Sequence, residues 1–199
     1  MKHILLLLCL PVGMLGGERI DYWIEACRPA TSGCAKSDIE LAEWALDAWA
    51  RASDGALEWQ RTTSAADALL QFHWAPPKER YHGEARPFLA GNRQGSRVYI
   101  RADLSGFPGS VGERSRLDPL YRDSVIYLTC LHEIGHALGM NHALLPGPIM
   151  YNGDRLTRVF ADFRAGLRVR SDIRRSSAIS AYDRNRLKSL LWSRRVTAR

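Results

Sequence analysis

Three histidines within eleven residues constrain this chain more than any other feature of its sequence. The stretch from His132 to His142 reads H-E-I-G-H-A-L-G-M-N-H. On a helix, His132 and His136 lie one turn apart on the same face, so both can direct a ring nitrogen at one ion. A single helix cannot surround a metal, but Gly139 can adopt a left-handed conformation that ends the helix. We therefore expect the chain to turn back there and to bring His142 to the same ion.

This ligand set predicts a catalytic rather than a structural zinc ion. Three neutral imidazoles leave one tetrahedral position open, and the pKa of a water molecule bound there falls to about 7. Glu133 follows the first ligand and can take a proton from that water and later pass it to a leaving amine. The alternative is an ordinary helix with polar residues. It would bury two histidines and a glutamate without partners, at about 1–3 kcal/mol each.

The length and composition indicate one folded domain. The chain has 199 residues, of which 46% are hydrophobic and 25% are charged. These values exclude a disordered or fibrous chain, and the length fits a single domain over residues 18–199.

Residues 1–17 differ from the rest of the chain. Lys2 precedes an apolar run, residues 4–15, that ends in two glycines. This is the pattern of a secretory signal peptide, and the run is shorter than the ~20 apolar residues that a membrane-spanning helix needs. The alternative is an N-terminal segment buried in the fold. We expect a secreted or periplasmic protein whose mature form has no membrane span.

The cysteines fit an exported chain. Cys27 and Cys34 bracket a loop that contains Pro29 and Gly33, so they could close a small disulfide in an oxidising compartment. Cys130 then has no partner. We interpret it as a buried, inert thiol, and a role in zinc binding is the alternative.

The net charge of +7 is unevenly distributed along the chain. Residues 152–199 hold thirteen Arg or Lys and four Asp, whereas residues 18–151 are net acidic. A basic tail can bind nucleic acid or anionic membranes. Here the arginines are not interleaved with aromatic residues, and no nucleic-acid-binding motif is recognisable. We interpret the tail as a solvated basic face and expect no nucleic-acid partner.

The hydrophobic periodicity predicts an α+β fold in which strands precede the main helices. We expect strands at residues 20–26, 57–61, 68–74, 82–87 and 96–102. We expect helices at residues 38–53, from Asp118 or Asp123 to about 138, and at 179–192. Residues 104–117 are typical of a surface loop, and residues 154–177 are ambiguous and at best partly helical.

The histidine stretch resembles the signature H-E-x-x-H-x-x-G-x-x-H of the metzincin zinc proteases. Pro148-Ile149-Met150-Tyr151 is similar to the Met-turn of that clan. Together the two segments look most like the matrixins, the matrix metalloprotease type, including their small bacterial relatives. The match is close over residues 123–152. Residues 179–192 are similar to the C-terminal helix of the family, and the segments before 123 match only in topology.

The resemblance implies an exported zinc endopeptidase with one catalytic zinc ion at the floor of a cleft and a protein or peptide as its substrate. It implies a twisted, mostly parallel sheet of about five strands, two long helices and a C-terminal helix. Met150 would form an apolar base under the imidazoles, which is compatible with an ordinary core residue. Gly83 and Ala85 would lie on the strand at the upper rim, where extended substrate pairs with the main chain. The basic segment 152–178 falls where the family builds the wall of its specificity pocket. It could select acidic or large side chains.

The sequence also departs from the family. Tyr151 directly follows Met150, whereas the tyrosine-ligand subfamilies place it one residue later, so we assign Tyr151 no metal-binding role. His73 and His82 lack the spacing of the structural zinc site of animal members, and Glu84 stands where such a ligand would fall. We expect no second zinc and interpret both histidines as surface or hydrogen-bonded residues. No cysteine-switch propeptide and no calcium loop are recognisable, although main-chain calcium sites stay open. We expect a monomer.

Two other functions stay open. One is a zinc-containing binding protein that has lost turnover, and the other is a basic surface-associated module in which residues 152–199 act. The intact Glu133 favours peptide hydrolysis, because a degenerate site is expected to lose its base first.

Overall fold

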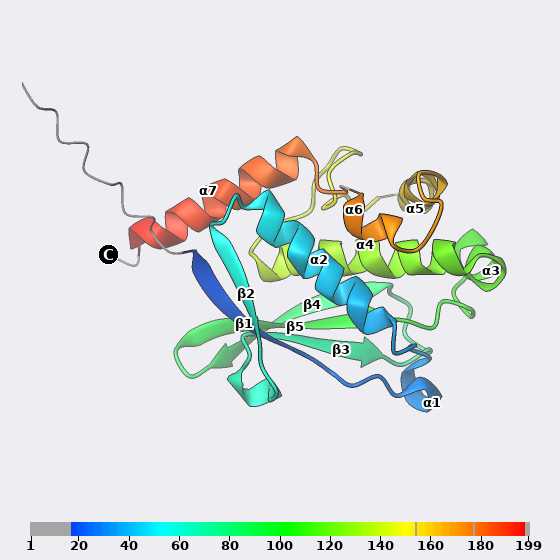
Figure 1. Ribbon diagram of the computed structural model, residues 1–199, viewed down its shortest axis with the longest axis horizontal. Helices are drawn as coiled ribbons and strands as arrows, with labels where there is room; N and C mark the ends of the chain where they lie inside the picture. Colours follow the sequence, from blue (N-terminus) through cyan, green and yellow to red (C-terminus); the bar gives the residue numbers. More distant parts are fainter. Residues whose placement is uncertain (1–16, 154, 177, 198–199) are drawn as a thin grey trace, which may run out of the picture.

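Figure 1 shows a computed structural model of the protein, which describes residues 17–153, 155–176 and 178–197. The predicted signal peptide lies outside the described residues except for Gly17. The described chain forms a five-stranded sheet in the order β2-β1-β3-β5-β4. Only the β4–β5 pair is antiparallel. The strands are β1 (Glu18–Ile24), β2 (Leu57–Arg61), β3 (Leu70–Ala75), β4 (Gly83–Ala90) and β5 (Arg93–Arg101). The predicted mostly parallel sheet is confirmed.

Helices α2 (Asp38–Ala52) and α4 (Pro119–Ala137) lie together on one side of the sheet, and α7 (Ala181–Thr197) lies near their C-terminal ends (Figure 1). Together with the sheet they confirm the predicted α+β class. Smaller helices complete the chain: α1 (Pro29–Ser32), the 3₁₀ helix η1 (Ala65–Asp67), α3 (Ser110–Leu117), α5 (Leu156–Ala165) and α6 (Asp172–Arg175).

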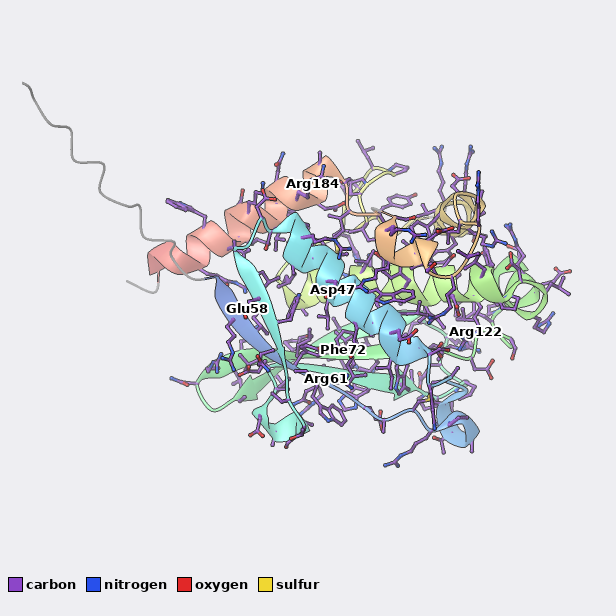
Figure 2. All side chains as sticks on the ribbon, in the orientation of Figure 1. Asp47, Glu58, Arg61, Phe72, Arg122 and Arg184 are labelled. Atoms are coloured by element: carbon purple, nitrogen blue, oxygen red, sulfur yellow. A yellow bond between two sulfur atoms is a disulfide. The ribbon has the colours of Figure 1, made fainter. Side chains whose placement is uncertain are left out.

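The core lies between the sheet and these helices. Phe72 of β3, near the centre of Figure 2, and Ile100 of β5 are each no more than 1% exposed. Trp49 of α2 is fully buried, and its indole N–H donates a hydrogen bond of 2.9 Å to the carbonyl oxygen of Leu131 in α4. Burial of such large side chains contributes about 1.5–3 kcal/mol each. The core therefore fixes α4 against both α2 and the sheet.

The start of α4 follows one of the two expected caps. The Asp118 carboxylate accepts hydrogen bonds from the backbone amides of Leu120 (3.0 Å) and Tyr121 (3.1 Å), and Pro119 occupies the first helical position. A side-chain acceptor at this place satisfies amides that have no partner within the helix. Asp118, and not Asp123, therefore begins the helix that carries the histidines.

The predicted surface loop at 104–117 is partly wrong, because residues Ser110–Leu117 form α3. Val111 in this helix is buried, and the Arg114 guanidinium lies 4.6 Å from the centre of the Tyr121 ring. A Cβ atom on Gly112 would lie 2.1 Å from the carbonyl oxygen of Phe107, so the chain folds back closely here. Glycine, which indicated a loop in the sequence, instead permits this close approach.

Strand boundaries also differ from the predicted ones. β1 covers residues 18–24 instead of 20–26, and β4 and β5 extend towards each other until only Gly91 and Asn92 connect them. Gly91 has φ +63°, which a two-residue hairpin connection requires. The alternation of side chains identifies these strands, but it does not locate their ends to the residue.

The composition of the basic C-terminal region suggested a solvated face, but part of its charge is used within the fold. Residues 154–177 contain α5 and α6, and several of their arginines contact the acidic N-terminal part of the chain. Among these ion pairs are Arg164–Asp118 and Arg170–Asp123, both at 2.8 Å. Farther along the chain, Arg194 of α7 pairs with Glu18 at 3.1 Å. The uneven charge of the sequence is thus partly neutralised within the fold.

Cys27 and Cys34 form a disulfide, as the sequence allowed, and Cys130 is fully buried. Burial raises the pKa of the Cys130 thiol well above its usual value, so the group stays protonated and inert. A disulfide fits an extracytoplasmic location. Within the described residues, no helix combines the length and the apolar character that crossing a membrane requires.

Candidate metal centre

The end of α4 brings the three histidines together. Gly139 has φ +91°, its amide donates to the carbonyl oxygen of His136, and the amide of Met140 donates to that of Gly135, both at 2.9 Å. These two bonds and the left-handed glycine form a Schellman turn, which stops the helix and reverses the chain. The predicted turn is therefore present, and it returns His142 to the face that carries His132.

The imidazoles converge through their Nε2 atoms. Nε2 of His136 lies 3.2 Å from that of His132 and 3.0 Å from that of His142. The three donor atoms all lie within 4.8 Å of one another, so this group could hold a metal ion. Imidazole nitrogens suit zinc, copper, iron and nickel rather than calcium or magnesium.

Backbone carbonyls set the tautomers of two of these rings. Nδ1 of His132 lies 2.8 Å from the carbonyl oxygen of Ile149, and Nδ1 of His136 lies 2.8 Å from that of Met140. A carbonyl oxygen only accepts, so each Nδ1 carries the proton and each Nε2 presents its lone pair to the centre. Burial lowers the pKa of His132 to about 4 and also lowers that of His136. Both rings are therefore neutral near pH 7, as metal binding requires.

The third histidine is held differently. His142 is exposed, and the side-chain nitrogen of Asn152 lies 3.4 Å from its Nε2 atom. Sequence analysis missed Asn152. Its only signal is its position directly after the predicted Met-turn.

A buried methionine lies against the helix between the first two histidines. Met150 is fully buried, and a Cβ atom on Gly135 would lie 2.3 Å from its sulfur atom. The amide of Ile149 donates to the buried carboxylate of Asp183 at 2.9 Å, which ties this segment to the start of α7. Asp183 was also missed by sequence analysis, because its partner is 34 residues away in the chain.

Glu133 lies beside the triad under strand β4. Its side chain is buried, and a Cβ atom on Gly83 would lie 2.8 Å from Cγ of Glu133. Burial raises the pKa of Glu133 to about 8, with a smaller contribution from the negative charge of Glu84, while a hydrogen bond from the backbone of Ala85 lowers it. The absence of a side chain at Gly83 thus lets the edge strand approach the carboxyl group closely.

The three histidines and Glu133 line one cavity of 590 Å³. The three histidines and Glu133 lie on one side, and Gly83 and Ala85 of β4 line it as well. From the basic segment 152–178, the cavity is lined by Asn152 and by three apolar side chains of α5, Leu156, Val159 and Phe160. The arginines of that segment do not line it. This wall is therefore apolar, and the segment's positive charge lies elsewhere.

The interpretation of His82 as a surface or hydrogen-bonded residue is wrong. Its ring stacks on Phe107 with 4.0 Å between centroids and meets the edge of Phe160, and its Nε2 atom is buried without a hydrogen bond. Burial, aided by the charge of Arg101, lowers the pKa of His82 to about 4. His73 is half-buried, and its Nδ1 lies 3.6 Å from the Glu25 carboxylate.

No model of a known protein family matches this chain, and no curated protein matches its sequence. The three-histidine cluster on a helix that follows a mixed five-stranded sheet is consistent with an H-E-x-x-H-type metzincin pattern.

Proposed function

We propose that this protein is an exported zinc-dependent endopeptidase of the metzincin clan, most like the matrixins. One observation carries the proposal: three imidazole Nε2 atoms converge beside a buried carboxyl group in a cavity that runs under an edge strand. His132, His136 and His142 would hold the ion, and their fixed tautomers support this assignment. When bound, zinc supplies Lewis acidity, which activates water and polarises a carbonyl oxygen.

Glu133 is the proposed general base. Its carboxylate would accept a proton from the attacking water, and the carboxylic acid formed in this way would pass that proton to the nitrogen of the leaving amine. Burial and Glu84 favour the protonated form of Glu133 in the protein alone. A nearby divalent cation favours the carboxylate, so metal binding would prepare the base for its task.

The substrate is proposed to be a peptide in extended form. β4 ends the strand order of the sheet, so its outer edge can pair with an added strand, and Gly83 and Ala85 lie on the cavity side. The apolar wall of α5 would receive a large apolar side chain next to the scissile bond. Met150 would serve as the apolar base beneath the imidazoles.

Export is supported by the Cys27–Cys34 disulfide and by the sequence pattern of residues 1–17. Mass spectrometry of the protein secreted by its expression host would test this. A mature chain that begins near residue 18 is expected, and a chain that retains Lys2 would contradict the signal peptide.

The decisive experiment compares the wild type with Glu133→Gln in a digest of a peptide library, with bound zinc measured on both. Both proteins should bind one zinc ion, and the variant should lose about 10²–10⁴-fold in cleavage rate, the usual contribution of a general base. Glu113→Gln, at an exposed position of α3, is the matched control and should cleave normally. Equal cleavage by the wild type and Glu133→Gln would remove the assigned role. Zinc binding without any cleavage by the wild type would identify a binding protein.

A further inference from the structure

Asn152 presents its side chain to the metal centre from a segment whose main chain is fixed on both sides. On one side, Tyr151 is buried and forms an isolated parallel bridge with Ala143, the residue after the third histidine. On the other side, the carbonyl oxygen of Gly153 accepts a hydrogen bond of 3.1 Å from the amide of Leu156, at the start of α5. Asn152 itself is exposed and lines the cavity that holds the histidines. Its neighbours thus hold it in place, and its side chain stays accessible from the cavity.

The side-chain amide of Asn152 is directed at the histidine cluster. Its nitrogen lies 3.4 Å from Nε2 of His142, the same ring atom that lies 3.0 Å from Nε2 of His136. A histidine that binds a metal through Nε2 carries no hydrogen on that atom, so the Asn152 amide is the donor of this long contact. The N–H group is therefore directed at the place where a metal ion and the reacting group of a substrate would meet.

This N–H group needs another acceptor once the lone pair of His142 is used for a metal ion. The NH₂ group of an amide only donates hydrogen bonds, so it cannot serve as a fourth ligand. In the proposed reaction, water adds to the carbonyl carbon of the peptide, the π electron pair moves onto the carbonyl oxygen, and Glu133 takes one proton. The negative charge that develops on this oxygen is a strong hydrogen-bond acceptor.

We propose that Asn152 is a further catalytic residue, which donates a hydrogen bond to the oxygen of the scissile carbonyl as negative charge develops there. This inference rests on the proposed peptidase function and adds a hydrogen-bond donor to it. Because the main chain on both sides is fixed, the donor needs little rearrangement during the reaction. The charge leaves the oxygen when the carbonyl re-forms and the C–N bond breaks, and the proton held by Glu133 moves to the departing nitrogen.

The test compares Asn152→Ala and Asn152→Asp with the zinc-loaded wild type. Alanine removes the amide, whereas aspartate keeps its shape and has no N–H group when ionised. For a peptide identified in the library digest, kcat should fall about 10–100-fold in both variants, and KM should change little. A buried donor of this kind contributes about 10²–10³-fold, and the smaller effect is expected because water reaches this exposed side chain.

A second measurement does not depend on turnover. A phosphinic peptide with a leucine side chain next to its tetrahedral phosphorus resembles the group that forms when water adds to the carbonyl. Its affinity for the zinc-loaded protein, measured by calorimetry, should fall in Asn152→Ala by the same factor as kcat. The affinity for zinc, measured by chelator competition, should not change. Asn185→Ala, at an exposed position of α7, is the matched control and should keep both wild-type affinities and the wild-type kcat.

The outcomes separate the two proposals. An unchanged kcat and unchanged phosphinate binding in Asn152→Ala, or full activity of Asn152→Asp, overturn the role of Asn152 and leave the peptidase standing. Loss of zinc from Asn152→Ala also overturns it, because the residue would then support the metal site instead. If the wild type binds the phosphinic peptide but cleaves nothing, and Asn152→Ala weakens that binding, the donor is retained and the peptidase is overturned. Neither cleavage nor phosphinate binding by the wild type overturns both.

Discussion

The buried polar groups at the two ends of helix α4 differ in their partners. At its N-terminal end, carboxylates form ion pairs with arginines. The fully buried Asp38 accepts two hydrogen bonds from Arg122, at 2.9 and 2.7 Å, and Asp123 pairs with Arg170. At its C-terminal end, the three imidazoles face one another and the carboxyl group of Glu133 has no cationic partner among the described residues. The carboxylates at the N-terminal end are neutralised by partners within the fold. The imidazoles and Glu133 at the C-terminal end are instead arranged to bind a ligand from outside.

The largest expected effect is the loss of zinc binding when one of the three histidines at the C-terminal end of α4 is removed. His136→Ala should bind no zinc and cleave no peptide. In the wild type, zinc at about 100 times its Kd should stabilise the fold by about 2.7 kcal/mol and raise Tm by several degrees. The variant should show no such shift in a thermal melt. A zinc-dependent rise in the Tm of His136→Ala would show that the ion binds elsewhere.

Removing an ion pair at the N-terminal end of α4 should lower the stability of the fold and leave zinc binding intact. Arg122→Ala leaves Asp38 buried without its cation, so the free energy of unfolding should fall by about 3–5 kcal/mol. Zinc binding by the folded fraction should persist. Denaturant unfolding measures the first effect, and metal titration measures the second. The double variant Asp38→Asn/Arg122→Met should recover part of the loss, and an equal or larger loss would contradict the charge argument.

His82 offers a pH-dependent test near the metal centre. Its pKa of about 4 in the folded protein lies below the usual 6.5, so the unfolded chain binds more protons between these values. Stability from this residue is therefore complete above pH 6.5 and is lost as the pH falls towards 4, by at most about 3 kcal/mol. Arg101 is the charged group that faces it and also disfavours protonation.

His82→Phe removes this titration and keeps the ring contacts with Phe107 and Phe160. Denaturant unfolding of both proteins between pH 7 and 4 should show the wild type losing stability relative to the variant. Parallel curves would mean that His82 titrates normally.

The smallest expected effect concerns the contact between helix and methionine. Gly135→Ala would place a Cβ atom 2.3 Å from the sulfur of Met150, and overpacking of this kind costs about 1–3 kcal/mol. Zinc affinity should also weaken, because the carbonyl oxygen of Ile149 that orients His132 belongs to the displaced segment. Adding Met150→Ala should relieve the crowding and restore part of the affinity, as chelator competition would measure. Identical affinities in all three proteins would remove Met150 from the site.

The predictability of the two ends also differed. The histidine triad could be predicted because helical spacing and the turn at Gly139 are local properties of the chain. The pairing of Asp38 with Arg122 could not, since 84 residues separate them and any arginine could have served. In the same way, the apolar face of α5 was hidden in an arginine-rich segment. Only its place in the wall of the cavity beside the three histidines distinguishes Phe160, which is buried, from its charged neighbours.

The tie between Asp183 and Ile149 has a consequence for the order of assembly. The Ile149 amide donates to Asp183 and the Ile149 carbonyl oxygen lies against Nδ1 of His132, so helix α7 supports a candidate ligand 51 residues earlier in the sequence. A nascent polypeptide that has not yet reached α7 already contains the three candidate ligand histidines but lacks this support. Full activity of the proposed peptidase should therefore arise only after α7 has been synthesised and has packed against this segment, which would spare the producing cell from premature proteolysis.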